Sequence, residues 1–187
     1  MLMNIPNLLT IFRIIAIPIF VLFFYLPLSW NHLASALIFA VAAFTDWLDG
    51  YIARTFHQTS VLGEFLDPVA DKLVVAVALV LLVGEKSLPF LAIPAAVIVG
   101  REIVISALRE WMAEIGKRAS VAVSFVGKVK TFLQMVAIFL LLLYKPHGQV
   151  LFVILGYIFL YLAAILTLWS MVMYIKTAWP DLTLKQK

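Results

Sequence analysis

The segment at residues 45–72, TDWLDGYIARTFHQTSVLGEFLDPVADK, places four aspartates between two long apolar stretches. They are Asp46, Asp49, Asp67 and Asp71. Charged residues make up only 13% of the chain, so four carboxylates in one short polar segment need a physical explanation.

The spacing of the aspartates indicates two helix faces. Asp46 and Asp49 are three residues apart, and Asp67 and Asp71 are four apart. Residues at these separations lie on the same side of a helix. The polar residues 55–60 predict a chain reversal, so we expect two antiparallel helices whose acidic ends meet.

Small residues accompany the acids on both predicted helices. Gly50 and Ala53 follow Asp46 at i+4 and i+7, and Gly63 precedes Asp67 by four residues. Small side chains let a ligand or another backbone approach closely. The beginning of the second helix of the pair would also face this place, and a helix N-terminus favours a phosphate.

Two explanations for the acids compete. In a purely structural one, Asp67-Pro68 is an N-cap and N1 pair, and Asp71 complements the helix dipole. However, the only basic residues nearby in sequence are Arg54 and Lys72, too few to neutralise four acids. A divalent cation would remove the repulsion, and oxygen ligands favour magnesium, manganese or calcium over zinc. Two such ions can clamp the attacking and leaving oxygens of a displacement at phosphorus.

The composition indicates an integral membrane protein. Apolar residues make up 65% of the 187 residues, against about 45–50% in soluble proteins. The chain has no cysteine, which excludes disulfides and thiolate metal sites. A net charge of +4 without a basic run or nucleic-acid motif gives no sign of a nucleic-acid partner. We predict a single membrane-embedded catalytic domain, residues 1–187.

Hydropathy predicts an all-α bundle of six transmembrane helices, because six apolar stretches approach the ~20 residues that cross a bilayer. The segment Asn4-Ile5-Pro6-Asn7 is compatible with a short interfacial helix before the first span. The predicted spans are 5–27, 33–54, 66–84, 88–113, 128–144 and 149–175.

The distribution of Lys and Arg predicts the orientation. Eight of these residues lie at the connections near 54–66 and 114–130 and in the tail, whereas the opposite connections hold only Lys86 and Lys145. Positive charge marks the cytoplasmic side. We therefore expect both termini and the acidic segment in the cytoplasm, with the protein in the cytoplasmic membrane.

Basic residues of the fourth and fifth spans are candidates for an anion site. Arg101 lies inside the fourth span, where an unpaired arginine is costly, and Arg109 is two turns nearer the cytoplasm. Lys128 and, as a lesser candidate, Lys130 begin the fifth span on the same side. Arginine suits forked phosphate contacts. Pairing of these cations with Glu102, Glu110 and Glu114 is the competing explanation.

The acidic segment resembles the signature of the CDP-alcohol phosphatidyltransferase family. The match is Asp46-x-x-Asp49-Gly50-x-x-Ala53-Arg54, eight residues, then Gly63-x-x-x-Asp67-x-x-x-Asp71. NIPNLLTIFRII, LDPVADK, REIVISALREWMAEIGKR and VGKVKT further resemble the bacterial members that use sn-glycerol 3-phosphate as acceptor. The resemblance implies six transmembrane helices, a homodimer, and magnesium or manganese, two ions, as cofactor. It also implies CDP-diacylglycerol as the phosphatidyl donor.

The resemblance also implies residue roles. Asp46, Asp49, Asp67 and Asp71 would hold the metals, and Asp71 would also be the general base. The CDP-diacylglycerol pocket would comprise Asp46, Gly50, Ala53, Arg54, Gly63 and Asp67. Glycerol 3-phosphate would bind Arg101, Arg109, Lys128 and Lys130.

Other functions and residues remain open from sequence. Serine, inositol phosphate or phosphatidylglycerol as acceptor would keep the aspartates and change the basic pocket. Intramembrane acids also serve cation-coupled transporters, but these acids cluster at one edge and no inverted repeat is evident. Thr10 and Arg13, one turn apart, either take a lesser part on the substrate side or, for Arg13, snorkel to the interface.

Overall fold

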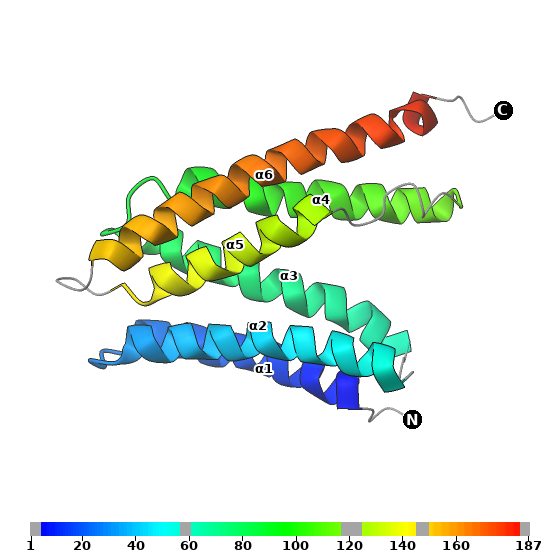
Figure 1. Ribbon diagram of the computed structural model, residues 1–187. Helices are drawn as coiled ribbons and strands as arrows, with labels where there is room; N and C mark the ends of the chain where they lie inside the picture. The colour runs from blue at the N-terminus through cyan, green and yellow to red at the C-terminus, as the bar shows by residue number, and fades with distance from the viewer. Residues whose placement is uncertain (1–4, 57–60, 117–124, 145–149, 184–187) are drawn as a thin grey trace.

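The protein is a bundle of helices in the computed structural model, which describes residues 5–56, 61–116, 125–144 and 150–183 (Figure 1). The helices within these ranges are α1 (Ile5–Tyr25), α2 (Asn31–Phe56), α3 (Val61–Gly84), α4 (Ala92–Glu114), α5 (Phe125–Leu142) and α6 (Val150–Thr183).

The helices run alternately up and down the bundle. The beginning of α1, the end of α2, the beginning of α3 and the ends of α4 and α6 lie toward the same end in Figure 1. The principal neighbours are α1 with α2 and α3, and α6 with α4 and α5. The acidic end of α2 therefore lies beside the acidic beginning of α3, as the helix-turn-helix prediction requires.

Apolar side chains fill the interior and also cover much of the outside. Phe20, Phe39 and Leu82 belong to a continuous buried core. Val80 and Ile165, by contrast, are 68% and 62% exposed. An exterior this apolar suits contact with lipid, where helices associate by close packing without a hydrophobic driving force.

Two of the described helices are long and apolar enough to cross a bilayer by length and composition. The qualifying segments are Asn7–Tyr25 and Val150–Pro180, and Asn31–Asp46 is a shorter apolar helix. The predicted interfacial segment lies partly in residues 1–4, outside the described ranges.

A glycine in α6 allows α5 to approach closely. A Cβ at Gly156 in α6 would lie 2.7 Å from Cγ of Leu141 in α5, below any normal contact distance. Small residues commonly permit such backbone approach between membrane helices. The packing of α5 on α6 matters for the site, because each helix contributes a side chain to it.

The observed boundaries correct one sequence-based explanation. We placed the start of the third span at residue 66, and the competing structural explanation took Asp67 as an N-cap, but α3 begins at Val61 and Pro68 lies inside it. Asp67 is consequently in the second turn and is not an N-cap. A proline within a membrane helix is tolerated where neighbouring groups satisfy the freed carbonyl. The sixth helix also extends to Thr183, eight residues beyond the predicted end.

Candidate active site

An arginine from α1 lies between the two acids of α2. Arg13 is 1% exposed, and its Nη1 donates to Oδ1 of Asp46 at 2.7 Å. Its Nη2 donates to Oδ2 of Asp49, which is 3% exposed. A guanidinium group offers five donors in a fixed fork, so one arginine can bridge two carboxylates.

The same face of α1 reaches the first acid of α3. The hydroxyl of Thr10, one turn before Arg13, donates to Oδ1 of Asp67. Three of the four aspartates thus contact α1. The snorkelling alternative for Arg13 is wrong, because the side chain is buried and ion-paired.

The charge balance of the acids also differs from the expectation. Arg13 contributes a positive charge that proximity in sequence does not reveal. Lys72, counted as a possible neutralising group, donates from Nζ to Oγ of Ser106 on α4 at 2.5 Å. Repulsion among the acids is therefore a weaker argument for a metal than it was from sequence.

The carboxylates fit magnesium or manganese by donor chemistry, since both ions prefer hard oxygen ligands. Their present arrangement does not form a closed ligand set: within the described ranges no group of three or more His, Cys, Asp or Glu side chains is placed to hold a metal ion. Asp46 and Asp49 instead contact Arg13. To bind a metal, these carboxylates would have to replace their contacts with Arg13 by contacts with the ion. The metal site stays a prediction.

Several residues of the matched signature lie beyond what the structure describes in detail. The side chains of Ala53 and Arg54, and the surroundings of Gly50, are outside the described residues, whereas Gly63 is buried in α3. The cytidine-pocket prediction therefore rests on sequence alone.

A cavity of about 660 Å³ lies next to the acids, between α3, α4, α5 and α6. Asp71 and Lys72 line it from α3, and Arg101, Glu102 and Arg109 line it from α4; α5 contributes Lys130 and α6 contributes Tyr174. The cavity consequently joins the last aspartate of the signature to three of the four predicted basic residues.

Asp71 differs from the other three aspartates. It is half-buried, and in the described part of the chain no hydrogen bond or ion pair engages its carboxylate. A carboxylate at the edge of a cavity, with its oxygens uncommitted, is able to accept a proton from a bound ligand.

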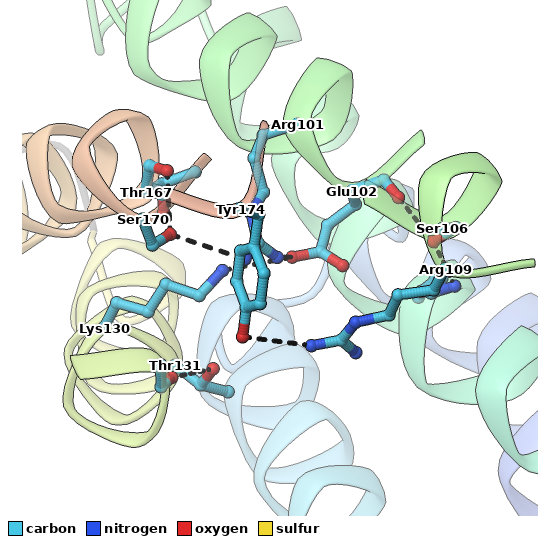
Figure 2. Close-up of polar contacts among 11 residues, drawn as sticks. Arg101, Glu102, Ser106, Arg109, Lys130, Thr131, Thr167, Ser170 and Tyr174 are labelled. Carbon is cyan, nitrogen blue, oxygen red and sulfur yellow. Dashed lines mark hydrogen bonds and ion pairs between the residues drawn. The ribbon is translucent and has the colours of Figure 1, made fainter. Parts of the chain in front are cut away.

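Arg101 is held from two sides at the centre of the site (Figure 2). It is 6% exposed, and its Nη1 donates to Oε1 of Glu102 at 2.8 Å. Its Nη2 donates to Oγ of Ser170 on α6 at 3.4 Å. Lys130 approaches the same Glu102 oxygen at 3.4 Å. One carboxylate thus lies between two cations and leaves a net positive charge in the cavity.

The two lysines of α5 take opposite positions. Lys130 is 4% exposed and lines the cavity, whereas Lys128 is exposed and is not among the lining residues. Residues two apart on a helix differ by about 200° in direction, so only one of the pair can face the cavity. The structure favours Lys130, the lesser candidate from sequence.

Arg109 has an aromatic partner. Its Nη2 donates to the hydroxyl oxygen of Tyr174 at 3.2 Å, and its guanidinium carbon lies 5.3 Å from the ring centre. The guanidinium of Arg101 lies 5.6 Å from the same ring. The acid-pairing alternative therefore applies to Arg101 and Lys130, both through Glu102.

Sequence reasoning missed the contribution of α6. Thr167, Ser170 and Tyr174 recur at separations of three and four residues within an otherwise apolar segment. A polar stripe at this period marks one helix face. This stripe could have indicated from the sequence that one face of α6 contributes to a polar site.

Together the groups suit a phosphorylated ligand that carries a hydroxyl. Arg101, Arg109 and Lys130 provide charge-assisted donors for a phosphate. Asp71, across the same cavity, provides an acceptor for the hydroxyl proton.

Comparison with known proteins identifies the family. The family model for CDP-alcohol phosphatidyltransferases matches residues 3–169. The chain belongs to the CDP-alcohol phosphatidyltransferase family. The acidic segment that resembles the family signature falls at the end of α2 and the beginning of α3, within the matched residues.

Similar proteins extend the match to almost the whole chain. A protein of Shigella flexneri serotype 5b is 56% identical over 179 residues, which are 96% of this chain and 97% of that one. One of Pseudomonas fluorescens is 56% identical, covering 96% and 92%, and one of Escherichia coli K12 is 55% identical, covering 96% and 97%. All three are named CDP-diacylglycerol–glycerol-3-phosphate 3-phosphatidyltransferase.

Proposed function

We propose that this enzyme transfers the phosphatidyl group from CDP-diacylglycerol to sn-glycerol 3-phosphate, giving phosphatidylglycerophosphate and CMP. The main support is the identity of 55–56%, over almost the whole chain, with proteins named for this reaction. The basic cavity beside Asp71 supports the same acceptor, because glycerol 3-phosphate combines a phosphate with a free primary hydroxyl.

In the proposed reaction the 1-hydroxyl oxygen of glycerol 3-phosphate attacks the phosphorus that bears diacylglycerol. Asp71 accepts the hydroxyl proton, and the bond from that phosphorus to the CMP oxygen breaks. CMP leaves with the bonding electrons. The step is a direct displacement and needs no covalent enzyme intermediate.

Two magnesium or manganese ions are proposed as cofactors, held by Asp46, Asp49, Asp67 and Asp71. When bound they supply charge stabilisation for the diphosphate and the departing CMP. Asp71 then serves as a loose ligand as well as base. The remaining donor-side residues, Gly50, Ala53, Arg54 and Gly63, are proposed to line the cytidine diphosphate pocket.

The acceptor phosphate is proposed to bind Arg101, Arg109 and Lys130. Glu102 offsets part of their charge, and the surplus favours a dianionic ligand. Lys128, which is exposed, is proposed to contribute only at long range. This arrangement argues against serine as acceptor, since serine brings no phosphate to pair with the buried Arg101 and Lys130 and the exposed Arg109.

The enzyme is proposed to cross the cytoplasmic membrane six times as a homodimer, with its active site and both termini inside. Support comes from the alternating helices, because the acidic end of α2 and the acidic beginning of α3 share one end of the bundle with the beginning of α1 and the end of α6 (Figure 1). A cation-coupled transporter is disfavoured, because the described acids of α2 and α3 gather at that one end.

The acceptor is tested with purified protein in detergent, CDP-diacylglycerol and magnesium. Glycerol 3-phosphate, serine, inositol phosphate and phosphatidylglycerol are supplied separately, and CMP release is measured. Release with glycerol 3-phosphate alone is expected. Release with serine but not glycerol 3-phosphate would overturn the proposed acceptor and the role of the basic cavity.

A further inference from the structure

One aromatic side chain contacts both arginines of the basic cavity. Tyr174 lies on α6 and is 8% exposed, and Figure 2 shows its ring in front of the Arg101 side chain, with Arg109 beside it. The guanidinium carbons lie 5.6 Å and 5.3 Å from the ring centre. The tyrosine hydroxyl also accepts a hydrogen bond from Arg109.

The two arginines contact the same ring although they are well separated along α4. Arg101 and Arg109 are eight residues apart, which is about 12 Å along an α-helix. Both side chains lean toward one ring on a neighbouring helix. Tyr174 is thus a contact that both guanidinium groups share.

The chemistry of the contact also matters. Two guanidinium groups in a partly dry cavity repel each other, and an acid placed between them would neutralise the charge needed for a ligand. An aromatic face attracts cations through its quadrupole and carries no net charge. A tyrosine can therefore hold both arginines and leave their positive charge available to a phosphate.

The two arginines differ in the other contacts that hold them. Glu102 already engages Arg101 and Lys130, and Ser170 engages Arg101. For Arg109, the contacts determined in the described residues are the two with Tyr174. Arg109 is the cation whose position depends most on α6.

We propose that Tyr174 is a positioning residue that holds Arg101 and Arg109 together for the phosphate of the acceptor. This inference rests on the proposed use of the cavity for glycerol 3-phosphate. Tyr174 itself acts through the arginines and does not take part in the displacement.

The test compares Tyr174→Met, which keeps much of the volume and removes the ring, with Tyr174→Phe, which keeps the ring and removes the hydroxyl. The methionine variant should raise KM for glycerol 3-phosphate about tenfold, because each arginine loses a contact of moderate strength. The phenylalanine variant should raise it only about twofold to threefold, because one hydrogen bond is lost. KM for CDP-diacylglycerol should stay within about twofold in both.

Tyr161→Met is the matched control on the same helix. Tyr161 donates a hydrogen bond to the carbonyl oxygen of Phe90, remote from the cavity, and should leave KM for glycerol 3-phosphate unchanged. An equal rise in both KM values for Tyr174→Met, or no rise in a folded variant, would overturn the positioning role. If the methionine variant does not fold, Tyr174→Leu, which also removes the ring, takes its place: a selective rise in KM for glycerol 3-phosphate supports the proposal, and no rise overturns it.

Arg109→Met separates this inference from the proposed acceptor site. An unchanged KM for glycerol 3-phosphate in Arg109→Met would refute the proposed acceptor-phosphate site at Arg109. A large rise in Arg109→Met together with no effect of Tyr174→Met would refute only the role of Tyr174. In the double variant that combines Arg109→Met with Tyr174→Met, KM for glycerol 3-phosphate should rise by less than the product of the two single-variant rises. Both changes remove the same contact between Arg109 and Tyr174.

Discussion

Replacing Arg13 by glutamine should strongly destabilise the protein. Arg13 is 1% exposed, and the side chain of its partner Asp49 is 4% exposed. Removing one member of a buried ion pair costs about 3–5 kcal/mol, because the other charge stays buried and loses the cation that pairs with it. The pair with Asp46, whose side chain is 39% exposed, adds at most about 1 kcal/mol.

This loss corresponds to a fall in melting temperature on the order of 10 °C for a chain of this length. Thermal unfolding of the detergent-purified protein, in the presence of a chelator, measures it. Lys86→Gln is the control, since it removes the same charge from an exposed position outside the helices. Magnesium should recover part of the stability of Arg13→Gln, because the proposed ions bind the same carboxylates. Equal melting temperatures for Arg13→Gln and the wild type in chelator would refute the buried pair.

Three further outcomes are expected from packing, charge and metal. Gly156→Ala should lower the free energy of unfolding by about 1–3 kcal/mol, because the new Cβ would clash with Leu141. Gly100→Ala, with nothing within 4 Å of the new Cβ, should leave the free energy of unfolding unchanged or raise it by up to about 1 kcal/mol. Similar denaturation midpoints for the two variants would contradict the close contact between α5 and α6. Lys130→Met should raise KM for glycerol 3-phosphate at least tenfold and Lys128→Met less than about threefold in steady-state assays, and the reverse order would place the phosphate elsewhere. Chelation should abolish CMP release and manganese should restore it; activity that survives exhaustive chelation would exclude the metal proposal.

The order of the helices was predictable because each of the six contains an apolar stretch, although among the described residues only α1 and α6 are long and apolar enough to cross a bilayer. The expected spans correspond one to one to α1 to α6. Boundaries were less accurate at the acidic segment, where Asp67-Pro68 carries a strong helix-start signal. Packing against α1, through Thr10 and Asp67, accompanies an earlier start of α3. Tertiary contacts of this kind outweigh a local capping preference.

The site was predictable where its residues share one local motif, and less so where they come from separate helices. Arg13 is 36 residues from Asp49 and Tyr174 is 65 from Arg109, so neither pairing follows from spacing. The choice between Lys128 and Lys130 depends on the rotation of α5, which charge counting does not determine. Arg101 and Arg109, eight residues apart on α4, both line the same cavity, whereas their role in binding a phosphate stays a prediction.

The central claim is that Asp71 and the basic cavity form one acceptor site, with Asp71 removing the proton. The most direct measurement compares CMP release and glycerol 3-phosphate binding in the wild type and in Asp71→Asn. The variant should lose CMP release by several orders of magnitude and still bind glycerol 3-phosphate within about tenfold of the wild type. Retention of rapid, glycerol 3-phosphate-dependent CMP release in Asp71→Asn would contradict the account.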